Sequence, residues 1–172
     1  MTDPDATLIE DYEDVSVYGL EEDDEAELLR LQNECTFIWV NREGWPVGVT
    51  MSYLHRDGCF WLTAVRPRKR IAAVERDPRV AVVVSSSGSP VRGSRTVTYK
   101  GTCTVHEDQA TKAWFYPALA ATLRPDPEAA RQFTRFLDSP KRVVLQVVPE
   151  QRIGFDGRKM GAATARAIAR QG

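Results

Sequence analysis

Cations are concentrated in one short stretch of the chain, at Arg66, Arg68, Lys69 and Arg70. A β-like run ends at Thr63 and Ala64 just before them, and the helical run IAAVER begins just after them. The start of a helix offers unpaired backbone N–H groups and a partial positive charge. Arginine adds planar bidentate contacts, and lysine adds a point charge. The residue types and their spacing therefore predict a phosphate site, with a solvated basic turn as the alternative.

Other kinds of chemistry find little support among the residues. Cys35, Cys59 and Cys103 stand far apart in apolar or β-like runs, without a CxxC or Cys/His spacing, and their odd number argues against a disulfide framework. We expect buried free thiols and no metal site. The two histidines, His55 and His106, belong to no nucleophile–histidine–acid arrangement. We therefore assign no catalytic side chain.

The charge of the chain is divided unevenly between its two parts. Residues 1–29 hold 12 of the 24 acidic residues and no Lys or Arg, whereas residues 30–172 carry 23 basic against 12 acidic side chains. A basic body is suited to nucleic acid or to an anionic small molecule. The sequence lacks a nucleic-acid-binding motif and aromatic platforms flanked by base, and an acidic leader would compete with phosphate backbones. We therefore expect a small-molecule substrate and no nucleic-acid partner.

Length and hydropathy bound the organisation of the chain. With 172 residues, one domain is expected, namely an acidic, mostly irregular leader over 1–20 followed by a single domain over 21–172. No run approaches the ~20 apolar residues of a membrane span, and the N-terminus does not resemble a signal peptide. We expect a cytoplasmic protein without membrane contact.

The elements that would position the cations are mostly strands. Alternating or β-branched runs predict strands over 35–40, 46–54, 59–64, 79–86, 95–105 and 142–148. Helices are predicted over 21–32, 71–76, 107–123 (kinked or interrupted by Pro117), 127–137 and the Ala-rich tail. Gly101 marks an expected bulge. Six strands with few, short helices predict a mainly β protein, an antiparallel barrel with peripheral helices rather than a βαβ sheet.

The order of these signals resembles a known family. A strand ending in Thr-Ala, a basic cluster, a short helix, Asp-Pro-Arg-Val and a buried strand follow one another from residue 63 to 84. This order is similar to that of the pyridoxamine 5′-phosphate oxidase-like flavin- and deazaflavin-binding proteins. The resemblance covers about residues 25–160. It implies a six-stranded antiparallel split β-barrel of the FMN-binding type.

The resemblance also implies a set of cofactor-binding residues. Arg68, Lys69 and Arg70 match the family's phosphate cluster, with Arg66 as a possible helper. The strand that lies against the flavin ring matches Val49, Thr50, Met51 and Ser52. The strand end near the ring and the ribityl chain matches Thr63 and Ala64, and Thr96 matches a position that reaches the cofactor from a second subunit in many relatives. Ordinary strand packing is the alternative for the strand residues.

The end of the chain narrows the function that the resemblance implies. The segment IGFDGRKMG does not match the Arg-rich substrate segment of the enzymes that oxidise pyridoxamine phosphate. It looks more like small members that use FMN or the deazaflavin coenzyme F-420. We expect a flavin (FMN) or F-420 dependent oxidoreductase acting on a small conjugated or heteroaromatic substrate. The alternative is a non-catalytic carrier or sensor of flavin, deazaflavin or haem.

The resemblance also implies a partner, which is a second copy of the chain. The apolar strands exceed what one small core needs. We expect a homodimer with two cofactor sites at the subunit interface.

Overall fold

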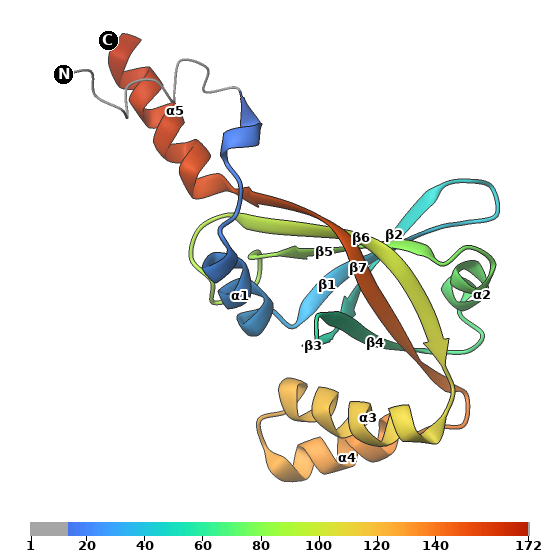
Figure 1. Ribbon diagram of the computed structural model, residues 1–172. Coiled ribbons are helices and arrows are strands. Elements are labelled where there is room, and N and C mark those ends of the chain that lie inside the picture. Colours follow the sequence, from blue (N-terminus) through green and yellow to red (C-terminus); the bar gives the residue numbers. More distant parts are fainter. Residues whose placement is uncertain (1–13, 172) are drawn as a thin grey trace.

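The chain folds around one strongly curled antiparallel sheet (Figure 1), in a computed structural model that describes residues 14–171. The strands are β1 (Glu34–Val40), β2 (Pro46–Ser52), β3 (Leu54–Arg56), β4 (Cys59–Val65), β5 (Arg79–Ser85), β6 (Arg95–His106) and β7 (Arg142–Asp156). Their order in the sheet is β2-β1-β5-β6-β7-β4-β3.

The edge strands of this sheet are consecutive in the chain. β2 ends at Ser52 and β3 begins at Leu54, so Tyr53 alone joins the two edges. A flat sheet of this width would hold its edges about 29 Å apart, whereas two peptide units reach about 7 Å. The sheet must therefore curl until its edges meet at Tyr53. The predicted antiparallel split barrel is confirmed.

The core fills the inside of this curl. Inward residues alternate along each strand, as Cys35, Phe37 and Trp39 do on β1. Two helices close the ends, because α2 (Lys69–Arg76) inserts Ile71 and α1 (Glu22–Leu31) inserts Leu28 into the same cluster. The short apolar faces of both helices are thereby covered.

A helical hairpin packs on the outside of the barrel (Figure 1). It consists of α3 (Gln109–Leu123) and α4 (Pro127–Leu137), whose Phe115 and Leu137 cover Val144 of β7. The predicted interruption at Pro117 is wrong, since α3 runs unbroken through it. Pro117 and Ala113 lie on the exposed side, so water can bond the carbonyl that the proline leaves without a donor.

Two strands differ from their predicted extent. The sequence suggests six strands, but the described residues form seven, because the segment read as a turn after residue 54 pairs with Cys59–Trp61 as β3. β7 continues to Asp156 rather than ending at 148. Pro149 is tolerated there because it lies opposite the register shift at Lys100/Gly101. That shift confirms the predicted bulge at Gly101.

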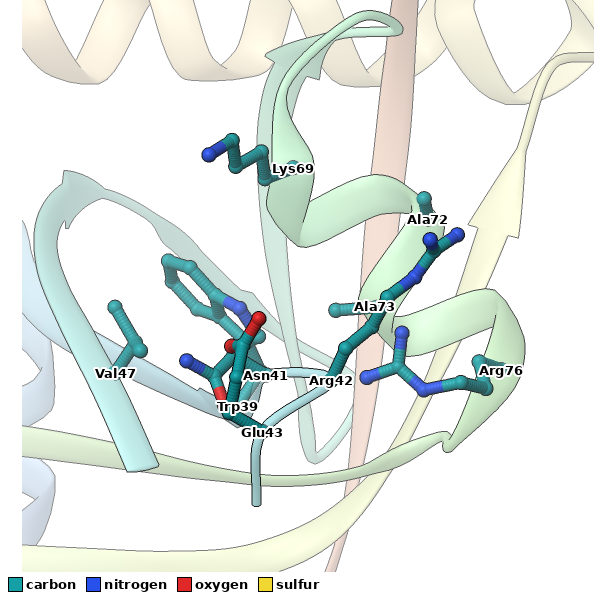
Figure 2. A pocket seen from close by; sticks show the side chains of 9 residues that line it. All are labelled: Trp39, Asn41, Arg42, Glu43, Val47, Lys69, Ala72, Ala73 and Arg76. Atoms are coloured by element: carbon teal, nitrogen blue, oxygen red, sulfur yellow. The ribbon is translucent and has the colours of Figure 1, made fainter. Parts of the chain in front are cut away.

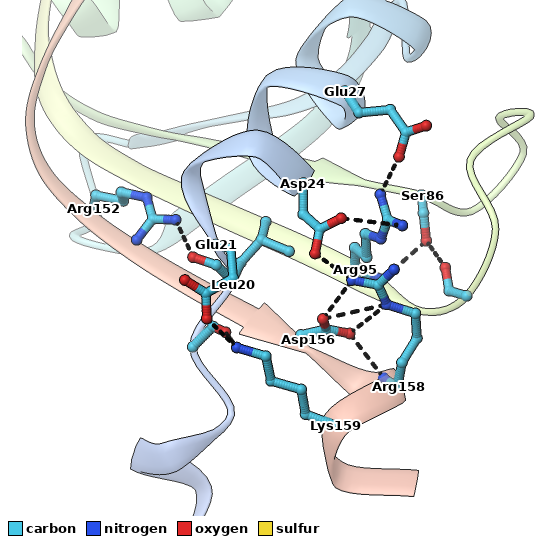
Figure 3. Close-up of polar contacts among 12 residues, drawn as sticks. Leu20, Glu21, Asp24, Glu27, Ser86, Arg95, Arg152, Asp156, Arg158 and Lys159 are labelled. Atoms are coloured by element: carbon cyan, nitrogen blue, oxygen red, sulfur yellow. Dashed lines mark hydrogen bonds and ion pairs between the residues drawn. The ribbon is translucent and has the colours of Figure 1, made fainter. Parts of the chain in front are cut away.

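The acidic residues of α1 meet basic residues at the far end of the sheet (Figure 3). α5 (Gly157–Gln171) follows β7 there. The ion pairs are Asp24 and Glu27 with Arg95, Glu25 with Arg152, Asp24 with Arg158 and Glu21 with Lys159. Part of the uneven charge of the sequence is thus neutralised by ion pairs within the described residues.

The part of the leader that the structure describes, residues 14–20, ends on the barrel. It contains the short 3-10 helix η1 (Val15–Val17) and then buries Tyr18 and Leu20. The Tyr18 carbonyl accepts a hydrogen bond from the Asp156 backbone N–H at 2.8 Å. The first 13 positions of the predicted leader lie outside the described residues.

Candidate functional site

The barrel is split next to the point where its edges meet. Leu54 of β3 pairs with Trp61 of β4, and this is the last pair of that ladder. Beyond it, β2 pairs only with β1 and β4 pairs only with β7, so β2 and β4 diverge without joining. Each strand keeps one edge of backbone N–H and C=O groups free of strand partners. Such groups are available to a ligand.

Two sets of predicted site residues lie on the two sides of this split. Val49, Thr50, Met51 and Ser52 form the end of β2, and Thr63 and Ala64 lie on β4 just beyond the last hairpin pair. Had the ladder continued in register, Ser52 would lie opposite Thr63. The two sets of residues therefore border opposite sides of one opening, and these sides diverge from Tyr53 onward.

The side chains of these strands are largely committed to the barrel. Val49 and Met51 pack against the core, and Ala64 is buried within it. The Thr63 hydroxyl donates to the Val143 carbonyl at 2.8 Å. Only Thr50 is exposed, with Ser52 half-buried. Contacts from this part of the site would come mainly from the backbone.

The basic cluster stands at the start of α2, directly after β4. Arg68 is the N-terminal cap residue and supplies no side-chain capping bond. Lys69 is exposed, whereas Arg70 is half-buried, and its Nε has no hydrogen-bond partner among the described residues. Burial and the neighbouring charge of Arg68 both lower the pKa of Arg70. A buried donor beside a like charge fits an oxyanion held at this helix start.

Arg66 differs from its three basic neighbours. Its Nη1 lies 2.7 Å from Glu75 and 2.6 Å from Glu107, so two carboxylates already neutralise it. No ion pair joins Arg68, Lys69 or Arg70 to a carboxylate within the part of the chain that the structure describes. The structure thus separates Arg66 from the cluster with which it was grouped.

Thr96 lies far from this cluster within one chain. Thr63 pairs with Val144, which pairs with His106 at the end of β6. Thr96 is ten residues earlier on the same strand, about 33 Å along it. The structure therefore does not bring Thr96 to the split.

A pocket of about 420 Å³ opens beside the basic cluster (Figure 2). Its lining residues come from β1, the β1–β2 turn, β2 and α2: Trp39, Asn41, Arg42, Glu43, Val47, Lys69, Ala72, Ala73 and Arg76. The volume is typical of small-molecule sites. Lys69 belongs to both the pocket and the basic cluster, so the two are adjacent.

Metal and thiol chemistry remain unsupported by the described residues. No group of three His, Cys, Asp or Glu side chains is placed to hold a metal ion in residues 14–171. All three cysteines are free; Cys35 and Cys103 are buried, and Cys59 is half-buried. Burial raises the pKa of the Cys35 and Cys103 thiols to about 12. No described helix is long and apolar enough to cross a membrane.

The family can be assigned from the order of these elements. The model of the family described as pyridoxamine 5′-phosphate oxidase matches residues 22–153, from α1 into β7. The chain belongs to this family. The predicted family is therefore confirmed, and the match spans the split, the basic cluster and the pocket. No curated protein matches the chain.

Several solved structures share this fold. The hypothetical protein Rv2991 of Mycobacterium tuberculosis has a TM-score of 0.70 and 21% identity, over 83% of this chain and 88% of its own. An F-420 reductase has a TM-score of 0.54 and 19% identity, over 73% of this chain and 93% of its own. HutZ, the haem storage protein of Vibrio cholerae, has a TM-score of 0.58 and 13% identity, over 78% of this chain and 96% of its own. At these identities the likeness shows the shared fold alone.

Sequence reasoning missed most of the pocket. Arg42 and Arg76 are 34 positions apart, and only the packing of α2 against the β1–β2 turn brings both into one lining. A weak signal was present, because Lys69, Ala72, Ala73 and Arg76 follow the spacing of one helix face. The turn NREGW alone carries no sign that its arginine faces a ligand site.

Proposed function

We propose that this family member is a flavin- or deazaflavin-dependent oxidoreductase acting on a small conjugated or heteroaromatic molecule. One observation carries the proposal, namely the buried Nε of Arg70 beside Arg68, without a carboxylate partner. An unsatisfied buried donor is costly, and a bound phosphate would satisfy it. FMN is the leading candidate and coenzyme F-420 the alternative, because both present a phosphate to the same cations.

The residues around the split suit the rest of such a cofactor. Arg68, Lys69 and Arg70 would hold the phosphate, while the free backbone edges of Val49–Ser52 and Thr63–Ala64 would contact the ring. When bound, the ring system supplies the hydride or electron transfer. The protein would bind it, orient it and shield it from water. No acid–base side chain is needed for that task.

A carrier or sensor without catalysis is the second candidate. The fold is shared with a haem storage protein, which favours a haem-binding version of this candidate. Against it, Met51 at the split packs against the core, and none of the pocket-lining residues is a His, Cys, Met or Tyr that could serve as an axial ligand. The residues near the basic cluster therefore suit an oxyanion better than a haem iron.

We further propose that the protein acts as a homodimer with its sites at the interface. Directly paired residues of an antiparallel sheet point to the same side, so Thr36, Val83, Thr98 and Ile153 form one row on the face opposite the core. The Ile153 side chain is 58% exposed. This row of small and apolar residues is suited to a second sheet face. Thr96 lies two positions before Thr98 on the same face of β6 and could then reach a partner's split.

Two measurements test the proposed function. The absorbance spectrum of the purified protein should show a flavin or deazaflavin band and lack a haem Soret band. Reduced FMN or F-420 should then be reoxidised by test acceptors faster with the protein than without it. A Soret band, or a bound flavin or deazaflavin that never turns over with any acceptor, would favour the carrier instead.

A further inference from the structure

The pocket beside the basic cluster has a second positive end. One face of α2 borders it with Lys69 at one end and Arg76 at the other, two helical turns or about 10 Å apart. Between them Ala72 and Ala73 leave room, and Trp39 forms part of the apolar floor. Figure 2 shows the side chain of Arg42 extending from the β1–β2 turn toward α2 and ending near Ala72.

The fold fixes the Arg76 side chain and the backbone of the turn that carries Arg42. The Nη2 of Arg76 donates to the Val40 carbonyl at 2.9 Å, which fixes its guanidinium at the end of β1. Arg42 stands in a turn closed by three bonds between Asn41 and Trp45 or Gly44, including Trp45 N–H to Asn41 Oδ1 at 2.8 Å. Arg76 is thus held without a ligand, and the exposed side chain of Arg42 lines the same pocket.

No carboxylate neutralises this pair within residues 14–171. Neither Arg42 nor Arg76 forms an ion pair there, although Glu43 also lines the pocket. Arg66, Arg95, Arg152 and Arg158 all have acidic partners. Two guanidinium groups that line one pocket repel each other unless an anion lies between them, and their planar forks match an oxyanion.

We propose that Arg42 and Arg76 bind the carboxylate of a small ligand whose apolar body lies on Trp39, Ala72 and Ala73. At this end of the pocket Arg42, Arg76 and Glu43 leave one net positive charge, while Lys69 lies at the other end; a single charge suits a carboxylate better than a phosphate dianion. The pocket of about 420 Å³ limits the ligand to a body of roughly drug-fragment size. Naming this ligand as the substrate rests on the proposed redox function; the binding site itself does not.

This site is separate from the one proposed for the cofactor phosphate. The phosphate cluster lies at the first turn of α2, whereas Arg76 is in its last turn. A ligand with its carboxylate at Arg76 would extend along the alanines toward Lys69. Its body would thus end beside the cofactor's expected position. The arrangement predicts an acidic substrate rather than a neutral or basic one.

The test compares a charged and a neutral probe on the purified full chain. By titration calorimetry, 2-naphthoate should bind at least ten-fold tighter than 2-naphthamide, which has the same ring system without the charge. Arg42→Gln and Arg76→Gln should each weaken naphthoate binding about ten-fold and leave naphthamide unchanged. Arg131→Gln, which removes an exposed arginine paired with Glu128 on α4, should change neither probe.

Titration of FMN and F-420 into the same variants separates the two proposals. Affinity for the cofactor should stay within about three-fold in Arg42→Gln and Arg76→Gln. If either variant loses FMN or F-420 along with naphthoate, the pocket belongs to the cofactor and the carboxylate site is wrong. Equal naphthoate affinity in wild type and both variants, or no binding at 5 mM, also overturns it. If naphthoate behaves as expected while wild type binds no cofactor, the carboxylate site stands and the proposed redox function fails.

Discussion

Asp24 of α1 and Arg158 of α5 form an ion pair across 134 positions of the chain (Figure 3). Arg158 also binds the carboxylate of Asp156, at 2.6 Å, and Asp156 is almost completely buried. The acidic helix and the basic end of the barrel are thus held together by a shared arginine. The sequence shows the two charge clusters but not that they meet.

Asp156 should make stability depend on pH in the acid range. Hydrogen bonds from Arg158 hold the pKa of this carboxyl below its usual value. Because the pKa is lowered on folding, the stabilisation is present above the unfolded value of about 3.9 and is lost as pH falls below it. Asp156→Asn should lower the free energy of unfolding by about 1–3 kcal/mol at pH 7 and by much less at pH 3. Urea denaturation at both pH values checks this, with exposed Asp23→Asn as a control that should cost less than about 0.5 kcal/mol.

If Asp156→Asn is as stable as wild type at pH 7, the carboxylate contributes nothing to the free energy of unfolding. If the substitution lowers the free energy of unfolding equally at pH 3, the stabilisation does not depend on ionisation of the carboxyl. Either result would contradict the proposed origin of the acid dependence.

Gly101 should tolerate no side chain. A Cβ there would overlap the carbonyl oxygen of Val148 on the neighbouring strand, at the bulge that lets β7 continue past Pro149. Gly101→Ala should therefore lower the free energy of unfolding by about 2 kcal/mol or more, since the backbone of β7 must shift. Gly161→Ala on α5, where a Cβ meets nothing within 4 Å, should be neutral or stabilising. Thermal denaturation of both variants distinguishes close backbone approach from a general effect of replacing glycine.

One thiol should react in the native protein and three in the unfolded chain. Burial raises the pKa of Cys35 and Cys103 to about 12, so at pH 8 almost none of either is thiolate. Cys59 is half-buried at the start of β4. Ellman's reagent should label one thiol per chain before denaturation, and none in Cys59→Ser. Two or three fast-reacting thiols in the native protein would show that the barrel opens readily.

The proposed dimer should depend on the outer face of the sheet. Light scattering at micromolar concentration should give twice the mass of one chain. Ile153→Asp should shift the mass toward the monomer, because it places a charge in a buried interface. Ile168→Asp, at a similarly exposed isoleucine on α5, should leave the mass unchanged. A monomeric wild type would contradict the proposal, and so would an Ile153→Asp variant that remains a dimer.

Much of the barrel was predictable because its signals are local. The turn NREGW, the Asp57-Gly58 turn and Gly101 each mark a change of direction or a bulge within a few residues. The signal for where β7 ends is not local, because it depends on a residue of the neighbouring strand. Pro149 reads as a strand end unless its neighbour Gly101 is known to provide the bulge.

The candidate site was predictable only in part. The sequence places Arg66 beside Arg68, Lys69 and Arg70, and charge alone cannot distinguish them. Arg66 leaves the group because Glu107, 41 positions later, folds against it. The buried Nε of Arg70 likewise depends on packing. Such distinctions arise from tertiary contacts, which the spacing of residues in the sequence does not predict.

The central claim is that Arg68, Lys69 and Arg70 hold the phosphate of a flavin or deazaflavin. Hydrogen bonds to a charged group are worth about 1.5–3 kcal/mol, so Lys69→Ala or Arg70→Ala alone should weaken binding about ten-fold or more. The double variant should nearly abolish it. Arg66→Ala removes the same charge from the same segment, but its carboxylate partners already neutralise it, so affinity should stay within about three-fold.

The decisive measurement is therefore a titration of FMN and F-420 into wild type, the Lys69→Ala/Arg70→Ala double variant and Arg66→Ala, with folding checked by circular dichroism. We expect at least one cofactor to bind wild type and Arg66→Ala alike and to be lost from the folded double variant. A double variant that binds both cofactors as tightly as wild type would contradict the phosphate site and the function built on it.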